Sequence, residues 1–357
     1  MKVLTFIICS NGYGHCIRTL KVLNEIFKNA LPIKYNIICN KAKVNFLKQE
    51  IHQDKFDLQF HTQLMENEPN WLDPQSLDFS SYLAWSEGFK TDQIIAESDL
   101  IISDNYVAPL DAARDTLLMG SFLWMDIIEQ YNSETKQIVA FQKELLGRKK
   151  PQIIALETMQ MDSLSTQAEV IGVPWFSERK AIENSSDQNK ILVTSGGTEH
   201  LDKVFLDFIE RLANKHENKI IFLDAKLYKK LDNTIKTVNK NIKAFDFTEI
   251  SFKTLDVIIC RPGIGILTDC ISFLIPPIVI YDSDNKEILH NAKKIIAKNL
   301  GIGFEIKKKS LTLEQWKEID FFLDANEKHQ LIQQNMLKEK MNGHQLAANK
   351  ILNQLLK

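Results

Sequence analysis

The segment Ser10-Asn11-Gly12-Tyr13-Gly14-His15 near the start of the chain has residue types that could do chemistry. Gly12 and Gly14 permit a sharp turn before a segment with helical periodicity, whose first amide groups favour an anion. Histidine titrates near neutral pH, so His15 is a candidate general base. An ordinary turn with a capping histidine is the alternative. Ile17 stands where a dinucleotide-binding fingerprint needs its third glycine, and no Walker-type Gly-Lys-Ser/Thr follows, so both of these nucleotide-binding loops are excluded.

Two more glycine-containing turns lie in the second half of the chain. The turn Ser195-Gly196-Gly197-Thr198 would present backbone N–H groups and a hydroxyl to a phosphate. The other turn contains Arg261, Gly263 and Gly265 and is followed by Asp269 on a predicted helix. A carboxylate in that place can accept hydrogen bonds from ribose hydroxyls, or can simply complement the helix dipole. Arg261 could neutralise a phosphate or pair with a surface acid.

An acidic segment follows another predicted strand. Asp282 and Asp284 form a D-x-D pair of the kind that can hold a divalent cation against a diphosphate, and Glu287 lies just beyond them. We expect no metal at this pair. A protein that binds a diphosphate without metal would instead depend on the amide groups of the glycine turns.

Short β-branched runs alternate with amphipathic segments along the chain, which indicates βαβ units and parallel sheets. A polar, aperiodic stretch at 178–189 predicts a linker between two Rossmann-like domains, 1–177 and 190–340, with a helix at 341–357 that returns toward the first. Ligands of such domains bind at the carboxyl ends of the strands, here in the cleft between them. The predicted strands are 3–9, 34–39, 56–60, 100–103, 153–156, 190–194, 219–223, 257–260 and 277–281. The predicted helices are 16–29, 44–51, 108–117, 201–215, 265–273, 289–298, 313–322 and 327–356, and 64–89 is predicted to be irregular.

Composition narrows the class of protein. The chain has 357 residues, 44% hydrophobic and 25% charged, which is enough apolar material for packed cores. A formal net charge of −2 argues against a protein that binds nucleic acid. Five cysteines without a C-x-x-C pair suit reduced thiols, so we expect a cytoplasmic protein. The lysines between 226 and 243 leave open a peripheral contact with the inner face of a membrane, although a solvated helix face also explains them.

Together these segments resemble the glycosyltransferases of the GT-B fold. The likeness is strongest to family 28, which includes the N-acetylglucosaminyltransferase that completes the bacterial lipid II precursor. The matching segments occur in the same order along nearly the whole chain. They are Gly14-His15, Gly196-Gly197-Thr198, Arg261-Pro262-Gly263 with Asp269, and Glu287 with Asn291-Ala292.

The chain also departs from that pattern. Asp269 stands where the family has glutamate, and Ile288 stands at or beside the place of a glutamine that contacts the donor sugar. The first loop, with Gly12, Gly14, His15 and Arg18, has the form G-x-G-H-x-x-R. That form is similar to less characterised relatives and to a hydrolase that removes the nucleotide from an activated dideoxy sugar. The resemblance therefore leaves the donor sugar unassigned.

The resemblance implies an inverting sugar transfer from a nucleotide diphosphate sugar, typically UDP-linked, to a hydroxyl acceptor in cell-envelope or glycan biosynthesis. His15 would deprotonate the acceptor hydroxyl, and the acceptor would be a glycan, a lipid-linked molecule or a small molecule. No cofactor or metal is required. A nucleotide-sugar hydrolase that uses water as the acceptor, and a non-catalytic nucleotide-sugar-binding protein, are the alternatives.

The same resemblance implies which residues would bind the nucleotide-sugar donor. Asp269 would hold the ribose hydroxyls, and Asp284 and Glu287 would meet the donor sugar. Arg18 and Arg261 would contact phosphate. The two glycine turns of the second domain would stabilise the departing diphosphate through their amides, and the segment 245–250 would grip the base through backbone atoms.

Overall fold

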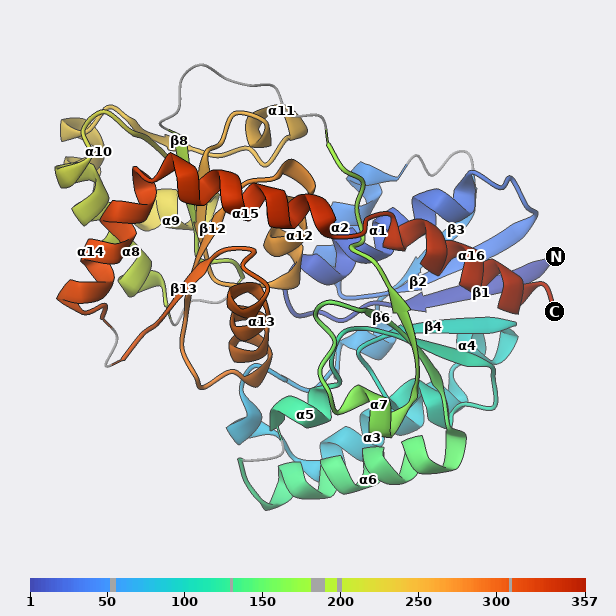
Figure 1. Ribbon diagram of the computed structural model, residues 1–357. Helices are drawn as coiled ribbons and strands as arrows, with labels where there is room; N and C mark the ends of the chain where they lie inside the picture. Colours follow the sequence, from blue (N-terminus) through green and yellow to red (C-terminus); the bar gives the residue numbers. More distant parts are fainter. Residues whose placement is uncertain (52–55, 129–130, 181–189, 198–200, 308–309) are drawn as a thin grey trace. The chain divides into compact units, whose positions relative to one another are not determined.

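The computed structural model describes the chain except residues 52–55, 129–130, 181–189, 198–200 and 308–309. The chain divides into two compact units, the first comprising Met1–Phe176 with Asn342–Lys357 and the second Ser177–Met341. Each unit is a parallel β-sheet covered by helices, as the βα alternation predicted (Figure 1). Most of the predicted linker, 178–189, lies outside the described residues.

The first unit has a seven-stranded parallel sheet in the order β3-β2-β1-β4-β5-β6-β7. Successive strands run outward from β1 in one direction and from β4 in the other, so the order reverses between these two neighbours. In doubly wound sheets, ligands bind at the carboxyl ends of the strands beside such a reversal. The strands are β1 (Lys2–Ile7), β2 (Ile33–Ile38), β3 (Asp57–His61), β4 (Leu100–Asp104), β5 (Thr116–Met119), β6 (Gln152–Leu156) and β7 (Glu169–Val173). The helices are α1 (Gly14–Phe27), α2 (Lys41–Glu50), α3 (Phe79–Thr91), α4 (Gln93–Glu97), α5 (Trp124–Ile128), α6 (Ser133–Lys149), α7 (Leu164–Gln167) and α16 (Gly343–Leu355), with 3₁₀ turns η2 (Gln63–Met65), η3 (Pro74–Ser76) and η4 (Ala108–Asp111).

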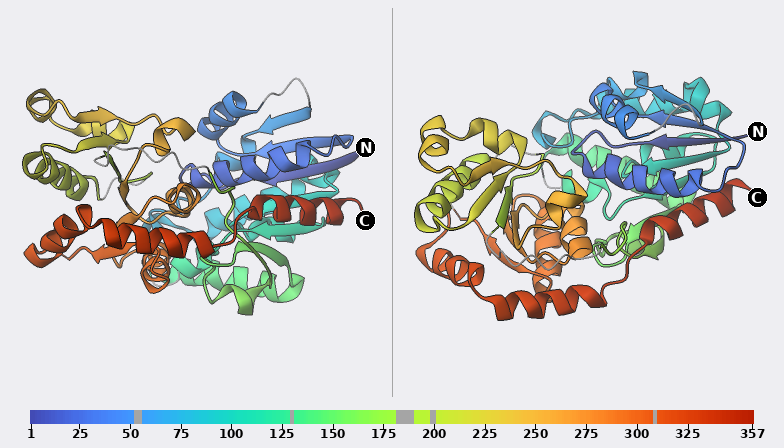
Figure 2. Two further views of the ribbon diagram at one scale, coloured as in Figure 1. Left: turned by 45° about the horizontal axis from the view of Figure 1, so that its top comes forward. Right: turned by 90° about the horizontal axis from the view of Figure 1, so that it is seen from above.

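The last helix of the chain belongs to the first unit. α16 lies along α1, as Figures 1 and 2 show, and it buries Ala347, Ile351 and Leu355. Its first residue, Gly343, donates its amide to the carbonyl of Trp175 at 2.9 Å. A Cβ at Gly343 would lie 2.0 Å from the carbonyl oxygen of Pro174, so only glycine allows the helix to begin this close to the preceding strand end.

The second unit has a six-stranded parallel sheet in the order β10-β9-β8-β11-β12-β13. Its order reverses between β8 and β11, which places the second crevice of this kind at the ends of these two strands. The strands are β8 (Lys190–Thr194), β9 (Ile220–Leu223), β10 (Ile242–Ala244), β11 (Val257–Cys260), β12 (Pro277–Tyr281) and β13 (Ile302–Glu305). The helices are α8 (Asp202–Lys215), α9 (Ala225–Lys230), α10 (Asn233–Val238), α11 (Glu249–Phe252), α12 (Ile264–Phe273), α13 (Lys286–Ala297), α14 (Leu313–Leu323) and α15 (Asn326–Lys338).

Three sequence predictions of secondary structure were wrong. Residues 108–117 form the short η4 and then enter β5, because Leu117 and Leu118 are buried as strand residues beside β4. The segment 64–89 contains α3, which begins where the Asp78 carboxylate accepts the amide of Ser81. The predicted helix 327–356 is two helices, because the chain turns through Asn342 with φ 70°.

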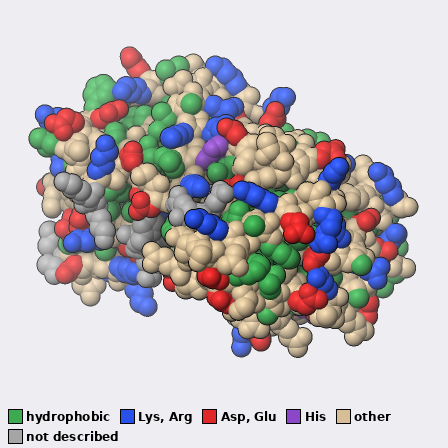
Figure 3. Space-filling view, turned by 90° about the horizontal axis from the view of Figure 1, so that it is seen from below, with side chains coloured by type: hydrophobic (Ala, Val, Ile, Leu, Met, Phe, Trp, Pro, Cys, Tyr) green, Lys and Arg blue, Asp and Glu red, His purple; other side chains and the backbone are tan. Residues whose placement is uncertain are grey.

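None of the helices in the described ranges is long and apolar enough to cross a bilayer. On the face drawn in Figure 3, acidic and basic side chains are interspersed with apolar ones, in keeping with the small net charge.

Candidate active site

The first group of polar residues lies at the reversal point of the first unit. β1 and β4 are parallel neighbours, with Ile7 paired with Ser103, so the loop after β1 and the end of β4 meet at one edge of the sheet. The loop carries Gly12, which has φ +69°, a conformation that suits glycine. Gly14 and His15 are the first two residues of α1. The imidazole of His15 therefore lies next to the last residue of β4, which is Asp104.

His15 and Asp104 form a close pair. Nδ1 of His15 lies 2.7 Å from Oδ1 of Asp104, with side-chain exposures of 15% and 1%. Because a carboxylate accepts only, Nδ1 carries the proton, and Nε2 is the ring atom able to take another proton. Nη2 of Arg18, one helical turn further along, lies 2.5 Å from the same carboxylate oxygen. The predicted residues His15 and Arg18 thus converge on one buried acid.

Asn105 completes the surroundings of this carboxylate. Its φ of 62° is one that asparagine tolerates better than most side chains. With its amide nitrogen facing acceptors, it donates to Oδ1 of Asp104 at 3.1 Å and to the Met119 carbonyl at 3.2 Å. A Cβ at Gly120 would lie 1.9 Å from one end of the Asn105 amide, so glycine at 120 makes room for this side chain. Asp104 is therefore held by donors on three sides.

The charges shift the pKa values of the pair apart. Burial acts to lower the pKa of His15, but the Asp104 carboxylate and the neighbouring Cys9 outweigh it and raise that pKa to about 10. Burial acts to raise the pKa of Asp104, but the positive charges of Arg18 and His15 bring it below its ordinary value. Below about pH 10 the pair is therefore an imidazolium facing a carboxylate, and Nε2 can accept a proton only in the neutral form of His15.

Lys43 and Tyr106 hold the glycine loop from its two sides. The buried Lys43 of α2 donates from Nζ to the carbonyl of Gly12 at 2.5 Å, and the same ammonium lies 3.7 Å from the centre of the Tyr13 ring. On the other side, the Tyr106 hydroxyl accepts the amide of Ser10 at 3.1 Å and donates in a short hydrogen bond to Glu68. The loop that carries His15 is thus fixed from both flanks.

Several buried polar atoms of this group have no hydrogen-bond partner among the described residues. They are Ser10 Oγ, Asn11 Nδ2, Arg18 Nε and Asp104 Oδ2. Buried polar atoms are normally paired in folded proteins, and atoms left open often mark a place for a ligand or water. The group around His15 therefore has spare hydrogen-bonding capacity beside a histidine that can accept a proton when it is neutral.

In the second unit, the turn after β8 is anchored by Asp224. Its carboxylate accepts the Thr194 hydroxyl at 2.8 Å and the Ser195 amide at 3.1 Å. Gly196 has φ +70°, and both Gly196 and Gly197 are exposed. Thr198 lies outside the described residues. The Gly196 amide makes only a long contact of 3.4 Å to the Thr194 hydroxyl. Because both glycines are exposed, this turn presents its backbone to solvent at the reversal point.

The turn after β11 leads directly into a helix. Gly263 is the N-cap of α12, and its own amide is taken by the Arg261 carbonyl at 2.8 Å. Since glycine has no side chain to cap the helix, the amides of Ile264, Gly265 and Ile266 have no intrahelical acceptor. This refines the sequence prediction: the first-turn amides including Gly265, rather than that of Gly263, are the groups able to face an anion.

Arg261 and the acids after β12 lie close together. Burial lowers the pKa of Arg261, while the charges of Glu287 and Asp282 oppose that shift. The Arg261 Nε atom is buried and has no hydrogen-bond partner in the part of the chain that the structure describes. Glu287 is in the first turn of α13, whereas Asp284 is exposed and donates its amide to Asp282 Oδ1 at 3.1 Å. The D-x-D pair therefore forms a turn, with Asp282 engaged by backbone.

The predicted donor residues share one edge of one sheet. β8, β11 and β12 are consecutive parallel neighbours, so the turns that follow them lie side by side. The buried Asn291 of α13 donates to the Pro262 carbonyl at 3.0 Å, which ties α13 to the turn after β11. Asp269 is half-buried, further along α12.

Sequence reasoning missed four residues of the first group. Asp104, Asn105, Lys43 and Glu68 were not singled out, although the acid and amide that directly follow the predicted strand 100–103 are the kind of signal that marks a strand-end site. Lys43 and Glu68 gave no such signal, because only the fold brings them to the glycine loop.

Comparisons with known proteins agree with this architecture. The family model described as "Glycosyltransferase family 28 C-terminal domain" matches residues 190–351. A search of curated proteins gives no match to the chain. Among solved structures, the chain is similar to the calicheamicin glycosyltransferase CalG4, with a TM-score of 0.62 at 13% identity, covering 100% of this chain and 99% of the other.

Two further structures have the same fold. The glycosyltransferase SnogD from Streptomyces nogalater gives a TM-score of 0.58 at 13% identity, with 99% of each chain covered. Phytolacca americana UGT2, complexed with UDP-2fluoro-glucose and pterostilbene, gives 0.65 at 10% identity, covering 100% of this chain and 99% of the other. The chain therefore has the predicted GT-B fold, and the match of its second half to the family 28 domain supports a glycosyltransferase.

Proposed function

We propose that the protein is an inverting glycosyltransferase that moves a sugar from a nucleotide diphosphate sugar, UDP-linked, to a hydroxyl of a glycan, lipid-linked or small-molecule acceptor. The observation that carries this proposal is the pair of His15 and Asp104, 2.7 Å apart. The carboxylate fixes the proton on Nδ1 and stabilises the imidazolium that forms when Nε2 takes a proton. This is the arrangement that a general base for a hydroxyl requires.

The second unit supplies the donor chemistry in this proposal. The first-turn amides of α12, Arg261 and the exposed turn of Gly196 and Gly197 are suited to a diphosphate, since helix N-termini and arginine favour anions. Asp269 would accept hydrogen bonds from ribose, and Glu287 and Asp284 from the sugar. The UDP analogue named for the UGT2 structure supports the choice of nucleotide.

The reaction balances without a cofactor. Nε2 of neutral His15 takes the proton of the acceptor hydroxyl as its oxygen attacks the anomeric carbon from the side opposite the diphosphate. The bond from that carbon to the diphosphate oxygen breaks, and the electron pair leaves with the nucleotide. Amide and guanidinium donors around the diphosphate stabilise the charge as it develops. We place this reaction in cell-envelope or glycan biosynthesis on the cytoplasmic side of the membrane, without a metal.

The test is a panel of UDP-sugars incubated with the protein, with and without glycan and lipid acceptors, in buffer with and without EDTA. We expect nucleotide release that depends on an acceptor and is unchanged by EDTA. His15→Ala should lose about 10²–10⁴-fold in turnover while it still binds the donor, and His15→Gln is the matched polar variant. Nucleotide release that is independent of acceptor would instead indicate hydrolysis, and unchanged turnover in His15→Ala would refute the assignment of the base.

A further inference from the structure

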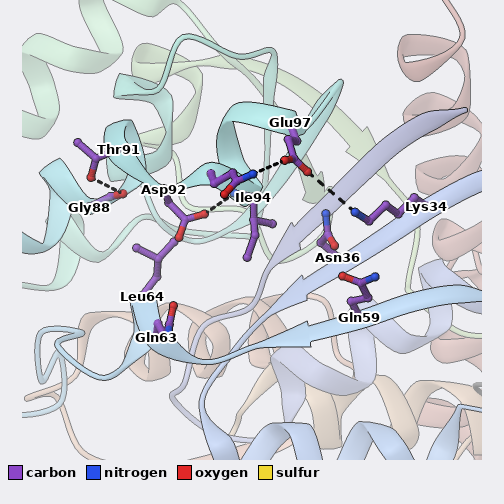
Figure 4. Close-up of a pocket in the computed structure, with 11 residues that line it drawn as sticks. Lys34, Asn36, Gln59, Gln63, Leu64, Gly88, Thr91, Asp92, Ile94 and Glu97 are labelled. Atoms are coloured by element: carbon purple, nitrogen blue, oxygen red, sulfur yellow. Dashed lines mark hydrogen bonds and ion pairs between the residues drawn. The ribbon is translucent and has the colours of Figure 1, made fainter.

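A second polar feature of the first unit is a pocket of about 600 Å³ at the β3 edge of its sheet (Figure 4). Its residues come from β2, β3, η2 and the segment from α3 to α4. Neither His15 nor Asp104 lines it. Pockets of this size are typical of small-molecule sites.

The floor of the pocket is a polar patch on one face of the sheet. On this face Lys34, Asn36 and Gln59 line the pocket. Asp57, which pairs with Lys34, lies on the same face outside the lining, as do His61 and the apolar Ile38 that pairs with it. The alternate positions on these strands are apolar. Strands of a parallel sheet are usually buried and apolar on both faces, so an alternating pattern leaves one face for water or a polar ligand.

The floor is a fixed surface. Asn36 is only 2% exposed, and its amide donates to the Thr5 hydroxyl at 3.4 Å and accepts from His61 Nε2 at 3.2 Å. The Thr5 hydroxyl is in turn 2.6 Å from that of Ser98. This chain of hydrogen bonds holds the Asn36 amide in one orientation. Gln59, in contrast, is exposed at the open side of the pocket.

The walls are built by capping interactions. Asp92 accepts the amides of Ile94 and Ile95, which begins α4 and places Ile94 over the pocket. Leu64 lies across the pocket from Lys34, as Figure 4 shows, and its Cδ2 would lie 3.1 Å from a Cβ at Gly88. Any larger residue at 88 would crowd this wall of the pocket.

The charges of the pocket select against anions. Lys34 lies 4.0 Å from Glu97, and Asp92 adds a second carboxylate, so the formal charge of these three groups is negative. The uncharged amides of Gln59 and Gln63 can each donate and accept, whereas Asn36 is engaged with Thr5 and His61, and Gln93 donates to Glu97 at 2.8 Å. A sugar hydroxyl also donates and accepts, so this lining matches a neutral polyhydroxylated ligand.

One short segment connects the pocket to the His15 group. Gln63 and Leu64 line the pocket, and Glu68, only four residues after Leu64, accepts the Tyr106 hydroxyl that contacts the loop before His15. β3 and β1 are separated by β2 alone, which is about 10 Å across the sheet at about 4.8 Å per strand. Asn36 lies two residues before the end of β2, about 7 Å along the strand at about 3.3 Å per residue, and His15 lies beyond the strand ends, so the two places are more than about 12 Å apart. An extended chain of two or three sugar rings can span such a distance.

We propose that this pocket binds a neutral saccharide portion of the acceptor, remote from the hydroxyl that reacts at His15. This inference rests on the proposed function and narrows its acceptor class to glycans with an uncharged segment. The pocket contributes affinity for the acceptor, and its side chains take no part in proton transfer.

Binding of defined probes to the full chain without donor tests the proposal. The probes are the neutral trisaccharides cellotriose, triacetylchitotriose and maltotriose, and trigalacturonate is the anionic comparison. Binding is measured by saturation-transfer NMR and by calorimetry. We expect at least one neutral trisaccharide to bind, and trigalacturonate not to bind. In the double variant Gln59→Leu/Gln63→Leu the affinity should fall by about tenfold, the equivalent of one or two hydrogen bonds. Gln137→Leu, an exposed glutamine of α6, is the matched control and should bind as the wild type does.

Three results would overturn the inference: no neutral trisaccharide binds, the double variant binds as well as the control, or trigalacturonate binds equally well. UDP-sugar binding and acceptor-dependent nucleotide release are measured in the same preparation. If these persist while trisaccharide binding fails, only the pocket assignment is wrong. If saccharide binds the pocket but no sugar is transferred, the pocket stands and the proposed transferase reaction is refuted.

Discussion

Nδ1 of His15 lies 2.7 Å from Oδ1 of Asp104, an atom that is also 2.5 Å from the Arg18 guanidinium. Two cationic groups thus share one carboxylate oxygen. The arrangement fixes the ring, but it also ties the protonation of His15 to the charge of Asp104. The first two predictions follow from this coupling.

The first prediction concerns the pH dependence of the rate. A base must be deprotonated, and the pKa of His15 is raised to about 10, so kcat/KM should increase as the pH rises toward about 10. Asp104→Asn removes the charge that raises this pKa, so the rising limb should move to lower pH while the maximal rate falls. Rates measured from about pH 6 to about pH 10.5 test this. Identical limbs in the two proteins would contradict the coupling.

The second prediction concerns stability. The pKa of His15 is raised from 6.5 in the unfolded chain to about 10 in the folded protein, so the folded state binds the proton more tightly. The stabilisation is fully present below about pH 6.5 and is lost as the pH rises through about 10. The difference in unfolding free energy between wild type and His15→Gln should therefore shrink over this window. Denaturant unfolding at several pH values measures it, and a constant difference would contradict the raised pKa.

A third prediction concerns Arg261. Its side chain is half-buried with Nε buried, and its charge interacts with Glu287 and Asp282. Arg261→Met should raise the donor KM by about 10–100-fold, because a hydrogen bond to a charged group contributes about 1.5–3 kcal/mol. The acceptor KM should stay the same, and Arg261→Lys should recover part of the loss. Lys203→Ala, an exposed cation of α8, is the control. An equal rise in both KM values would indicate general damage to the fold instead.

The fourth prediction concerns Lys43, which holds the Gly12 carbonyl at 2.5 Å. Lys43→Met leaves that carbonyl without its charged donor, so the loop before His15 should loosen and kcat should fall by about tenfold, with donor affinity unchanged. Lys43→Arg should restore part of kcat. Lys41→Met replaces an exposed lysine of the same helix and should behave as the wild type does. If kcat is normal in Lys43→Met, Lys43 has only a packing role.

Local patterns were sufficient for most strands and for the glycine turns. The strand residues 257–260 are a continuous apolar run, and 3–9 are apolar apart from Thr5. The turns that follow these two runs are where Arg261 and His15 lie. The sequence pattern assigns Thr116 and Leu117 of β5 to a helix over 108–117, because the strand character of β5 comes from pairing with β4, a contact remote in sequence.

In the candidate site, too, some residues belong to a local motif and others are brought in only by the tertiary fold. His15 and Arg18 lie in a recognisable local motif, whereas the acid that pairs with them is 89 residues away from His15. Its position depends on the crossover that brings β4 beside β1. Lys43 and Glu68 likewise reach the loop only through the tertiary fold, so periodicity and motif spacing could not assign them.

The packing of α16 on α1 has a consequence for how the chain is made. Residues near both ends of the sequence complete the same core, with His344 3.6 Å from Glu25 and Ile351 fully buried. During synthesis, α1 cannot be covered by α16 until α16 has left the ribosome. A nascent chain stalled before residue 342 should therefore be more sensitive to protease in α1 than the released protein, even though every strand of that sheet has already been translated.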